Sequence, residues 1–449
     1  MKRFLILLLI FIPAISFCQS KKAATSNKTN PATTKKTAPT AKSILPGAYQ
    51  TWEYLPRIKG KRVGIFANHT ATIGKTHLVD SLKKLGVKIT KIFGPEHGFR
   101  GDADAGEKVG DYIDKKTGIQ VISLYGTKRK PSAEDLADVD VMIFDIQDVG
   151  VRFYTYISHL QDFMESSIEH EKPLLIFDRP NPNGFYVDGP VLDTAYKSFV
   201  GMQSIPVVYG MTIGEYANFL VGQGLLDKDV MVKMMLGKVK KHIDNEDSTA
   251  TGPNITIIKC LNYTHKMTYN LPVKPSPNLP DAGSVFWYPS TCFFEGTVLS
   301  EGRGTSHPFQ IFGHPSLPNT MYAFTPVSRD GAKTPKLQNQ KSYGWNLTKE
   351  PIVQNASTKI ELKYLLEAYR LFPEKENFFI APKKDNPKPT EFFFNKLAGN
   401  SQLMQQIKAG KTEEEIRASW QPRLEIFKKI RKRYLMYPDF DEPNVKAPL

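Results

Sequence analysis

The turn Gly94-Pro95-Glu96-His97-Gly98 holds the side chains best suited to chemistry in this sequence. Glycines bracket a carboxylate and an imidazole directly after an apolar run. A tight loop can hold Glu96 partly out of water, and desolvation raises the pKa of a carboxyl group. Because a raised pKa suits a general acid, we expect Glu96 to exchange protons with a substrate. The alternative is a solvated turn in which His97 bonds to the backbone.

A second group of polar and aromatic side chains lies between Asp145 and Tyr156. Its carboxylates, amide and guanidinium could bind sugar hydroxyls, and Tyr154 or Tyr156 could stack on a sugar ring. The alternative for Asp148 and Arg152 is a buried ion pair at the start of a helix.

Two glycine-rich segments further along the chain add two glutamates and an arginine. Residues 294–297 contain Glu295, and residues 300–305 contain Glu301 and Arg303. The planar guanidinium of Arg303 matches a carboxylate, which makes it a natural partner for an anionic substrate group. A glycine-rich hairpin with a surface charge pair is the alternative.

Short apolar runs alternate with helix-like segments between residues 62 and 177, and these elements must position the polar groups. We expect helices over 77–85 and 155–169, and strands over 62–68, 87–93, 119–124, 139–144 and 173–177. Thr212 and Glu215 also have the spacing of a capping box, which predicts a helix that begins there. This alternation predicts an α/β fold, with a mostly parallel sheet covered by helices on both faces.

Polar residues follow each of the five predicted strands at the point where the strand ends. The first strand leads into Asn68, the second into Glu96 and the third into Tyr125, while residues 145–148 and 178–181 follow the last two. Open parallel sheets bind ligands at the carboxyl ends of their strands. We therefore expect the functional site at this edge of the sheet, although residues 178–184 are also rich in turn formers.

Two folded domains are expected, because about 400 residues exceed what one hydrophobic core normally supports. We predict a Rossmann-like N-terminal domain over 45–275 and a smaller α/β C-terminal domain over 276–449. The junction lies in the proline-rich stretch 271–280.

The first 44 residues are expected to lie outside the fold. Residues 1–20 have the basic start and short apolar run of a signal peptide, which predicts a periplasmic or secreted protein without stable membrane insertion. Lipid attachment at Cys18 is the alternative. Residues 21–44 are expected to be a disordered linker, because 21–42 contain no aromatic or large aliphatic residue.

The basic charge gives no reason to expect a nucleic-acid partner. Eight of the 60 basic residues lie in the first 42 residues, which leaves 52 basic against 45 acidic residues in the rest of the chain. No nucleic-acid-binding module is recognisable in the sequence.

Several cofactor and metal motifs are missing from the sequence. It contains no G-x-G-x-x-G, P-loop, G-x-S-x-G or H-E-x-x-H pattern and no zinc-type spacing, so we predict neither cofactor nor metal. Asp102, Asp104 and Glu107 do not fit an EF-hand loop. Cys260 and Cys292 are expected to be buried free thiols rather than a disulfide.

The string at 94–102, Gly-Pro-Glu-His-Gly-Phe-Arg-Gly-Asp, resembles a bacterial exo-β-N-acetylmuramidase family of glycoside hydrolases. Further strings resemble the same family in the same order over roughly 55–440, at 145–156, 178–184, 189–193, 275–280, 300–305 and 434–437. The resemblance implies a Rossmann-like domain, a smaller C-terminal domain and a site between them. It also implies release of N-acetylmuramic acid from the non-reducing ends of peptidoglycan fragments.

The resemblance implies that Glu96, which matches the central glutamate of the family, is the general acid/base. Glycoside hydrolysis usually needs a second carboxyl group, for which Glu295, Glu301 and Asp148 are candidates. A separation of about 5–5.5 Å would imply retention, and about 6.5–9.5 Å inversion. The acetamido group of the substrate could also replace a protein nucleophile.

The remaining site predictions concern substrate binding. The lactyl carboxylate of muramic acid could be bound by Arg100, Arg152 or Arg303. The other predicted contacts are Asn68, His97, Tyr154, Arg179 and Asn278. Two alternatives stay open: a non-catalytic receptor for muropeptides, and a metal-dependent hydrolase that uses His97, Asp102, Asp104 and Asp145.

Overall fold

A seven-stranded sheet forms the centre of the N-terminal part of the protein. The computed structural model describes residues 43–96, 98–101, 110–243, 255–350 and 359–442. In sheet order, the strands are β5 (Tyr112–Ile113), β6 (Gln120–Ser123), β4 (Lys88–Gly94), β1 (Arg62–Ala67), β7 (Val141–Asp145), β8 (Leu174–Phe177) and β9 (Ile255–Ile258). All neighbouring pairs are parallel except β5–β6. The five predicted strands are confirmed as β1, β4, β6, β7 and β8.

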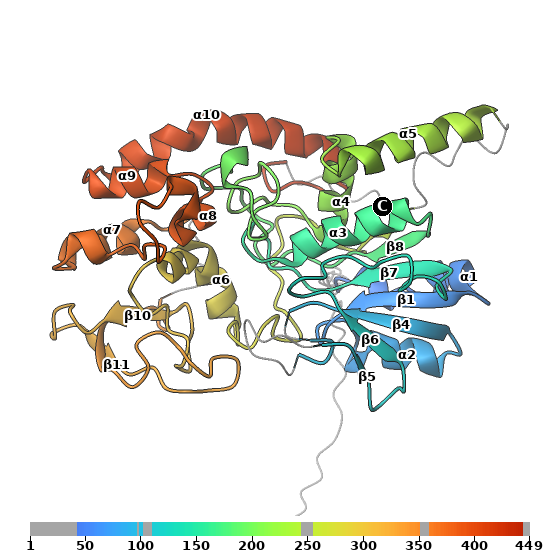
Figure 1. The fold of residues 1–449 in the computed structure, drawn as a ribbon, viewed down its shortest axis with the longest axis horizontal. Helices are drawn as coiled ribbons and strands as arrows, with labels where there is room; N and C mark the ends of the chain where they lie inside the picture. Colours follow the sequence, from blue (N-terminus) through green and yellow to red (C-terminus); the bar gives the residue numbers. More distant parts are fainter. Residues whose placement is uncertain (1–42, 97, 102–109, 244–254, 351–358, 443–449) are drawn as a thin grey trace, which may run out of the picture. The chain divides into compact units, whose positions relative to one another are not determined.

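Helices cover both faces of this sheet because its central strands alternate apolar residues between two cores. On one face, Val141 and Ile143 of β7 join the core of α1 (Thr51–Ile58) and α2 (Leu78–Lys84). On the other face, Phe144 joins the core of α3 (Tyr156–Glu169) and α4 (Ile213–Gly222). Figure 1 shows α3 running beside β7 and β8. Phe66 of β1 stacks on Phe144 with ring centroids 4.7 Å apart. The predicted α/β class and sheet are thus confirmed.

The sequence also predicted the main helices of this part correctly. The expected segments 77–85 and 155–169 correspond to α2 and α3. Thr212 and Glu215 form the predicted capping box at the start of α4. The other elements before residue 282 are α5 (Lys228–Ile243), the hairpin β2 (Thr72–Ile73) and β3 (Thr76–His77), and short 3-10 turns at Gly47–Tyr49 and Thr194–Tyr196.

The C-terminal part combines helices with a small antiparallel sheet. The sheet has the order β10 (Ile311–His314), β12 (Ser342–Asn346), β11 (Tyr322–Phe324). The helices are α6 (Ala282–Thr291), α7 (Lys363–Leu371), α8 (Phe393–Ala398), α9 (Gln402–Lys408) and α10 (Glu413–Arg431). Short 3-10 turns lie at Cys292–Gly296, Lys375–Asn377, Pro389–Glu391 and Lys432–Tyr434. The predicted domain boundary at 275/276 stays a prediction.

One hydrophobic core links this part to the sheet. The buried cluster that contains Phe144 and Phe163 continues through Tyr288 and Phe293 to Phe427 of α10. Cys260 and Cys292 are buried free thiols, as expected. Among the residues that the structure describes, no helix has the length and apolar character needed to cross a membrane.

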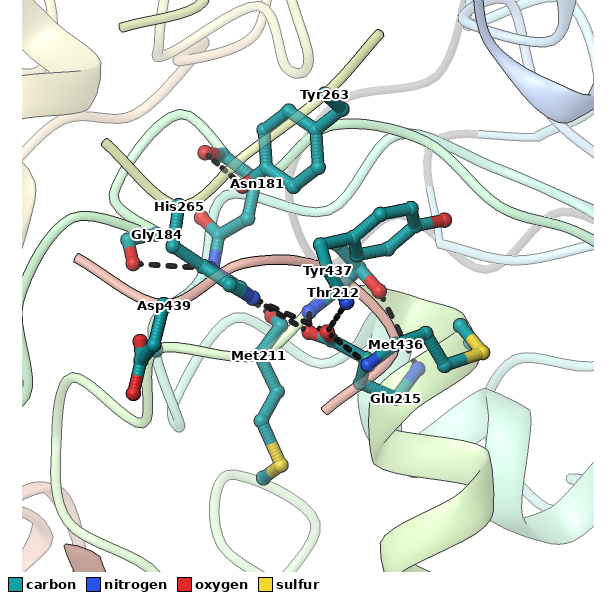
Figure 2. A network of polar contacts seen from close by, with 12 residues as sticks. Asn181, Gly184, Met211, Thr212, Glu215, Tyr263, His265, Met436, Tyr437 and Asp439 are labelled. Carbon is teal, nitrogen blue, oxygen red and sulfur yellow. Dashed lines mark hydrogen bonds and ion pairs between the residues drawn. The ribbon is translucent and has the colours of Figure 1, made fainter. Parts of the chain in front are cut away.

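A buried polar network fixes the segment around Met436 to α4. The Glu215 carboxylate accepts hydrogen bonds from the backbone N–H groups of Thr212 and Met436, at 2.9 and 2.8 Å (Figure 2). Nε2 of His265 lies 2.9 Å from the same carboxylate, and both side chains are fully buried. Buried polar groups are stable only when they are hydrogen-bonded, so the network holds three distant segments together.

Replacing Glu215 with Ala should lower the free energy of unfolding by about 3–5 kcal/mol, because it leaves His265 and the backbone donors without their acceptor. Urea denaturation monitored by fluorescence would measure this loss. Glu414→Ala, at an exposed position of α10, is the matched control and should change stability by less than about 0.5 kcal/mol. Equal stabilities of the two variants would contradict the role of the network.

Candidate active site

A cavity of about 420 Å³ lies where loops that follow the sheet strands meet segments of the C-terminal part. On the sheet side, Glu96 follows β4, Tyr125 follows β6, and residues 153–156 follow β7. The other lining residues are Phe199, Val200, Ser276, Asn278, Leu279, Tyr288, Glu295, Arg303, Phe309 and Phe393. The carboxyl ends of β4, β6 and β7 therefore contribute to one wall of the cavity.

Glu96 stands on the turn after β4 and is half-buried. Its Oε1 accepts a hydrogen bond of 3.0 Å from the hydroxyl of Tyr125. Burial and the charge of Glu96 raise the pKa of Tyr125 to about 12, so this hydroxyl stays protonated and remains a donor at neutral pH. The carboxylate is thus held in a defined orientation at the cavity wall.

Glu295 contributes a second carboxylate to the cavity, and it is paired with Arg303. Nη2 of Arg303 lies 2.7 Å from Oε1 of Glu295, and its Nε lies 3.3 Å from Oε1 of Glu301. Lys336 completes the cluster at 2.8 Å from Oε2 of Glu301. Two cations therefore balance two carboxylates.

Glu301 lies behind this wall rather than on it. Burial alone would raise the pKa of its carboxyl group, but the charges of Lys336 and Arg303 hold the pKa below its usual value. Glu301 is therefore an ionised partner of the two cations, and among these acids only Glu295 reaches the cavity.

Asp148, the third candidate for the second carboxyl group, is buried away from the cavity lining. It accepts hydrogen bonds from the hydroxyl of Tyr209 and the backbone N–H of Gly150. Burial raises the pKa of Asp148 to about 6. Asp148 therefore serves as a hydrogen-bond acceptor that stabilises the loop after β7.

Of the predicted substrate-binding residues, Tyr154, Asn278 and Arg303 line the cavity. The hydroxyl of Tyr154 donates to the carbonyl of Pro275 at 2.8 Å, and Nδ2 of Asn278 donates to the carbonyl of Gly331 at 2.8 Å. The ring of Tyr154 packs edge-to-face against Tyr156, with centroids 4.7 Å apart. These contacts build an aromatic wall against which a sugar ring could pack.

Two of the predicted arginines, Arg100 and Arg179, form ion pairs outside the cavity. Arg100 pairs with Asp114 at 2.8 Å and Asp80 at 3.3 Å. Arg179 is buried and pairs with Asp145 at 2.6 Å. The structure thus places Arg100 and Arg179 outside the cavity lining.

Arg152 is fully buried and binds backbone rather than lining the cavity. Its guanidinium donates to the carbonyls of Pro190, Ile205 and Leu397 at 2.7–2.8 Å. Burial lowers the pKa of Arg152 to about 9. Neither the predicted contact with substrate nor the alternative ion pair with Asp148 is seen, and Arg152 instead connects the loop after β7 to α8.

Asn68 supports the wall from behind. Its Nδ2 donates to the hydroxyl of Tyr156 at 2.8 Å, while its Oδ1 accepts from the backbone N–H of Thr70 at 2.9 Å. His97, Asp102 and Asp104 lie outside the described residues. Among the residues that are described, no group of three or more His, Cys, Asp or Glu side chains could hold a metal ion.

Several lining residues were not predicted from the sequence. Tyr288, Phe199, Phe309 and Phe393 come from segments distant in sequence, and isolated aromatic residues have no local signal that separates a cavity wall from a core. The sequence did indicate Tyr125 as a site residue, because it directly follows a predicted strand. Leu279 lines both this cavity and a smaller one of about 160 Å³.

Replacing Asp148 with Asn should change how stability depends on pH. The raised pKa means that folding favours the neutral carboxyl group, so the wild type loses stability as pH rises from about 4 through about 6. Asn does not titrate, so the stability of the variant relative to wild type should increase by roughly 3 kcal/mol between pH 4 and pH 7. Urea denaturation across this range is the measurement.

The exposed Asp385 provides the matched control, because Asp385→Asn should leave this pH dependence unchanged. A stability difference between Asp148→Asn and wild type that stays constant from pH 4 to pH 7 would contradict the assignment.

Comparison with known proteins places the chain in a family. Models of the N-terminal and C-terminal parts of exo-beta-N-acetylmuramidase NamZ match residues 63–283 and 286–437. The peptidoglycan beta-N-acetylmuramidase NamZ of Bacillus subtilis (strain 168) is 37% identical over 405 residues, which cover 86% of this chain and 89% of that protein.

Two crystal structures of DUF1343 family proteins from Bacteroides fragilis have the same fold. The first is 40% identical to this chain in sequence, with a TM-score of 0.75. The match covers 89% of this chain and 100% of that protein. The second is 26% identical to this chain, with a TM-score of 0.69. The match covers 88% of this chain and 99% of that protein. With both family models matched in order along the conserved fold, the chain belongs to the exo-beta-N-acetylmuramidase NamZ family and is a glycosidase.

Proposed function

We propose that this glycosidase is exo-acting and releases N-acetylmuramic acid from the non-reducing ends of peptidoglycan fragments, with Glu96 as its general acid/base. The observation that carries the proposal is the position of Glu96 on the cavity wall, held by Tyr125 and sharing the lining with Glu295. The relative from Bacillus subtilis acts on peptidoglycan according to its name. A signal peptide at residues 1–20 would bring the enzyme to the periplasm or outside the cell, where its substrate occurs.

The proposed reaction begins with proton transfer to the glycosidic oxygen. Glu96 donates its proton to the leaving oxygen as the bond from that oxygen to the anomeric carbon breaks. Water then adds to the anomeric carbon and returns a proton to Glu96, which restores the acid. Proton transfer of this kind contributes about 10²–10⁴ in rate.

Glu295 is our proposed second carboxyl group. Of the three candidates, Glu295 alone lines the cavity, whereas Glu301 and Asp148 are buried behind it. The contact with Arg303 orients Glu295, and a carboxylate in this position would stabilise positive charge that develops at the anomeric carbon.

Glu96→Gln should lower the turnover of a chromogenic β-glycoside of N-acetylmuramic acid at least about a hundredfold, because an amide cannot donate the proton. Glu414→Gln is the surface control and should keep wild-type turnover. Mass analysis of wall fragments incubated with the wild type should detect free N-acetylmuramic acid. Near-normal turnover by Glu96→Gln would refute the role of Glu96, and tight binding without product would indicate a receptor.

Tyr125→Phe should reduce kcat about tenfold or more with little change in KM. The substitution removes the hydrogen bond that orients Glu96, and a hydrogen bond to a charged group is worth about 1.5–3 kcal/mol. Steady-state kinetics with the same glycoside would measure the effect. Tyr322→Phe, on the exposed strand β11, is the matched control, and an equal kcat for both variants would argue against the orienting role.

A further inference from the structure

The cavity needs a cation for an anionic substrate, but the arginine on its wall is already balanced by acids. Arg303 is the one Lys or Arg side chain on the cavity lining within the described parts of the chain. It pairs with both Glu295 and Glu301. Because two acids already share its charge, Arg303 has little free positive charge to attract a further carboxylate.

Arg129 supplies a cation next to this wall. It lies in the loop after β6, four residues beyond Tyr125, and its side chain is exposed. Its guanidinium carbon lies 4.5 Å from the ring centroid of Phe199, which lines the cavity. In the part of the chain that the structure describes, no carboxylate lies within ion-pair distance of Arg129.

The ring under Arg129 is held in place by contacts with α3. Oγ of Ser158 donates to the carbonyl of Phe199 at 2.8 Å, which anchors the loop to α3. His159 packs edge-to-face against the ring at 4.9 Å. Burial lowers the pKa of His159 to about 3, so this imidazole is neutral and does not repel Arg129.

Arg129 lies close enough to act electrostatically on both the cavity wall and α3. Its charge acts on the hydroxyl of Tyr125 on the cavity wall and on the carboxyl group of Asp162 in α3. Burial raises the pKa of Asp162 to about 7, so near neutral pH this acid carries only part of a negative charge. The charge of Arg129 is therefore incompletely balanced.

We propose that Arg129 binds a carboxylate of the substrate at the edge of the cavity. A guanidinium stacked on a ring can still donate hydrogen bonds from its edge, and its planar fork matches a carboxylate. The inference rests on the proposed function. In a wall fragment, the carboxylate belongs either to the lactyl group of muramic acid or to the attached peptide.

The test compares ligands with and without these carboxylates. Calorimetry would measure binding of N-acetylmuramic acid, its peptide-bearing form and N-acetylglucosamine, which lacks both groups. Arg129→Ala should weaken binding of a carboxylate-bearing ligand at least about tenfold and leave N-acetylglucosamine unchanged. Arg129→Lys should recover part of the loss, and Arg370→Ala, at an exposed position of α7, is the control.

The ligand that responds identifies the carboxylate. A loss with free N-acetylmuramic acid assigns Arg129 to the lactyl group, whereas a loss confined to the peptide-bearing form assigns it to the peptide. An equal loss with N-acetylglucosamine, or no loss with either carboxylate ligand, would overturn the proposal. If the wild type binds these ligands but cleaves no muramic acid glycoside, the proposed function fails while the binding role of Arg129 is still decided.

Discussion

Burial of both faces of the central strands is the constraint on which the rest of the structure depends. Strands β7 and β8 have no exposed residue, and the one charged side chain on them, Asp145 at the last position of β7, is paired with Arg179. Polar groups can enter only where the strands end and the chain turns over the edge of the sheet. This constraint gathers Asn68, Glu96, Tyr125, Asp148 and Arg179 at one edge.

The polar groups at this edge then divide into two kinds. Asn68 and the charged groups at or after the ends of β7 and β8 are buried and bonded to other parts of the protein, as in the pair of Arg179 with Asp145. A buried charge left without a partner would cost several kcal/mol, so these groups have little freedom to bind a ligand. Glu96 and Tyr125 follow β4 and β6 and reach the cavity, where they meet Glu295 from the C-terminal part.

The sequence predicted the elements well because their signals are local. The apolar runs of β1, β4, β6, β7 and β8 and the capping box of α4 each lie within a few consecutive residues. The family strings likewise selected the turn that contains Glu96. These signals do not depend on how distant segments meet.

Tertiary contacts decide which candidate residues line the cavity and which support the fold. The sequence could not predict this difference. Arg152 and Arg303 have similar glycine-containing neighbourhoods, yet Arg152 binds three carbonyls in the core and Arg303 lines the cavity. Arg129 had no signal at all, because its position depends on Phe199, seventy residues later in the chain.

A crystal structure of the Glu96→Gln variant with a bound muramic acid fragment tests the central claim most directly. The account predicts that the glycosidic oxygen lies about 2.6–3.2 Å from the side chain of residue 96 and that the anomeric carbon faces Glu295. A fragment bound in this cavity with its glycosidic oxygen against another carboxyl group, or a fragment bound outside the cavity, would contradict the account.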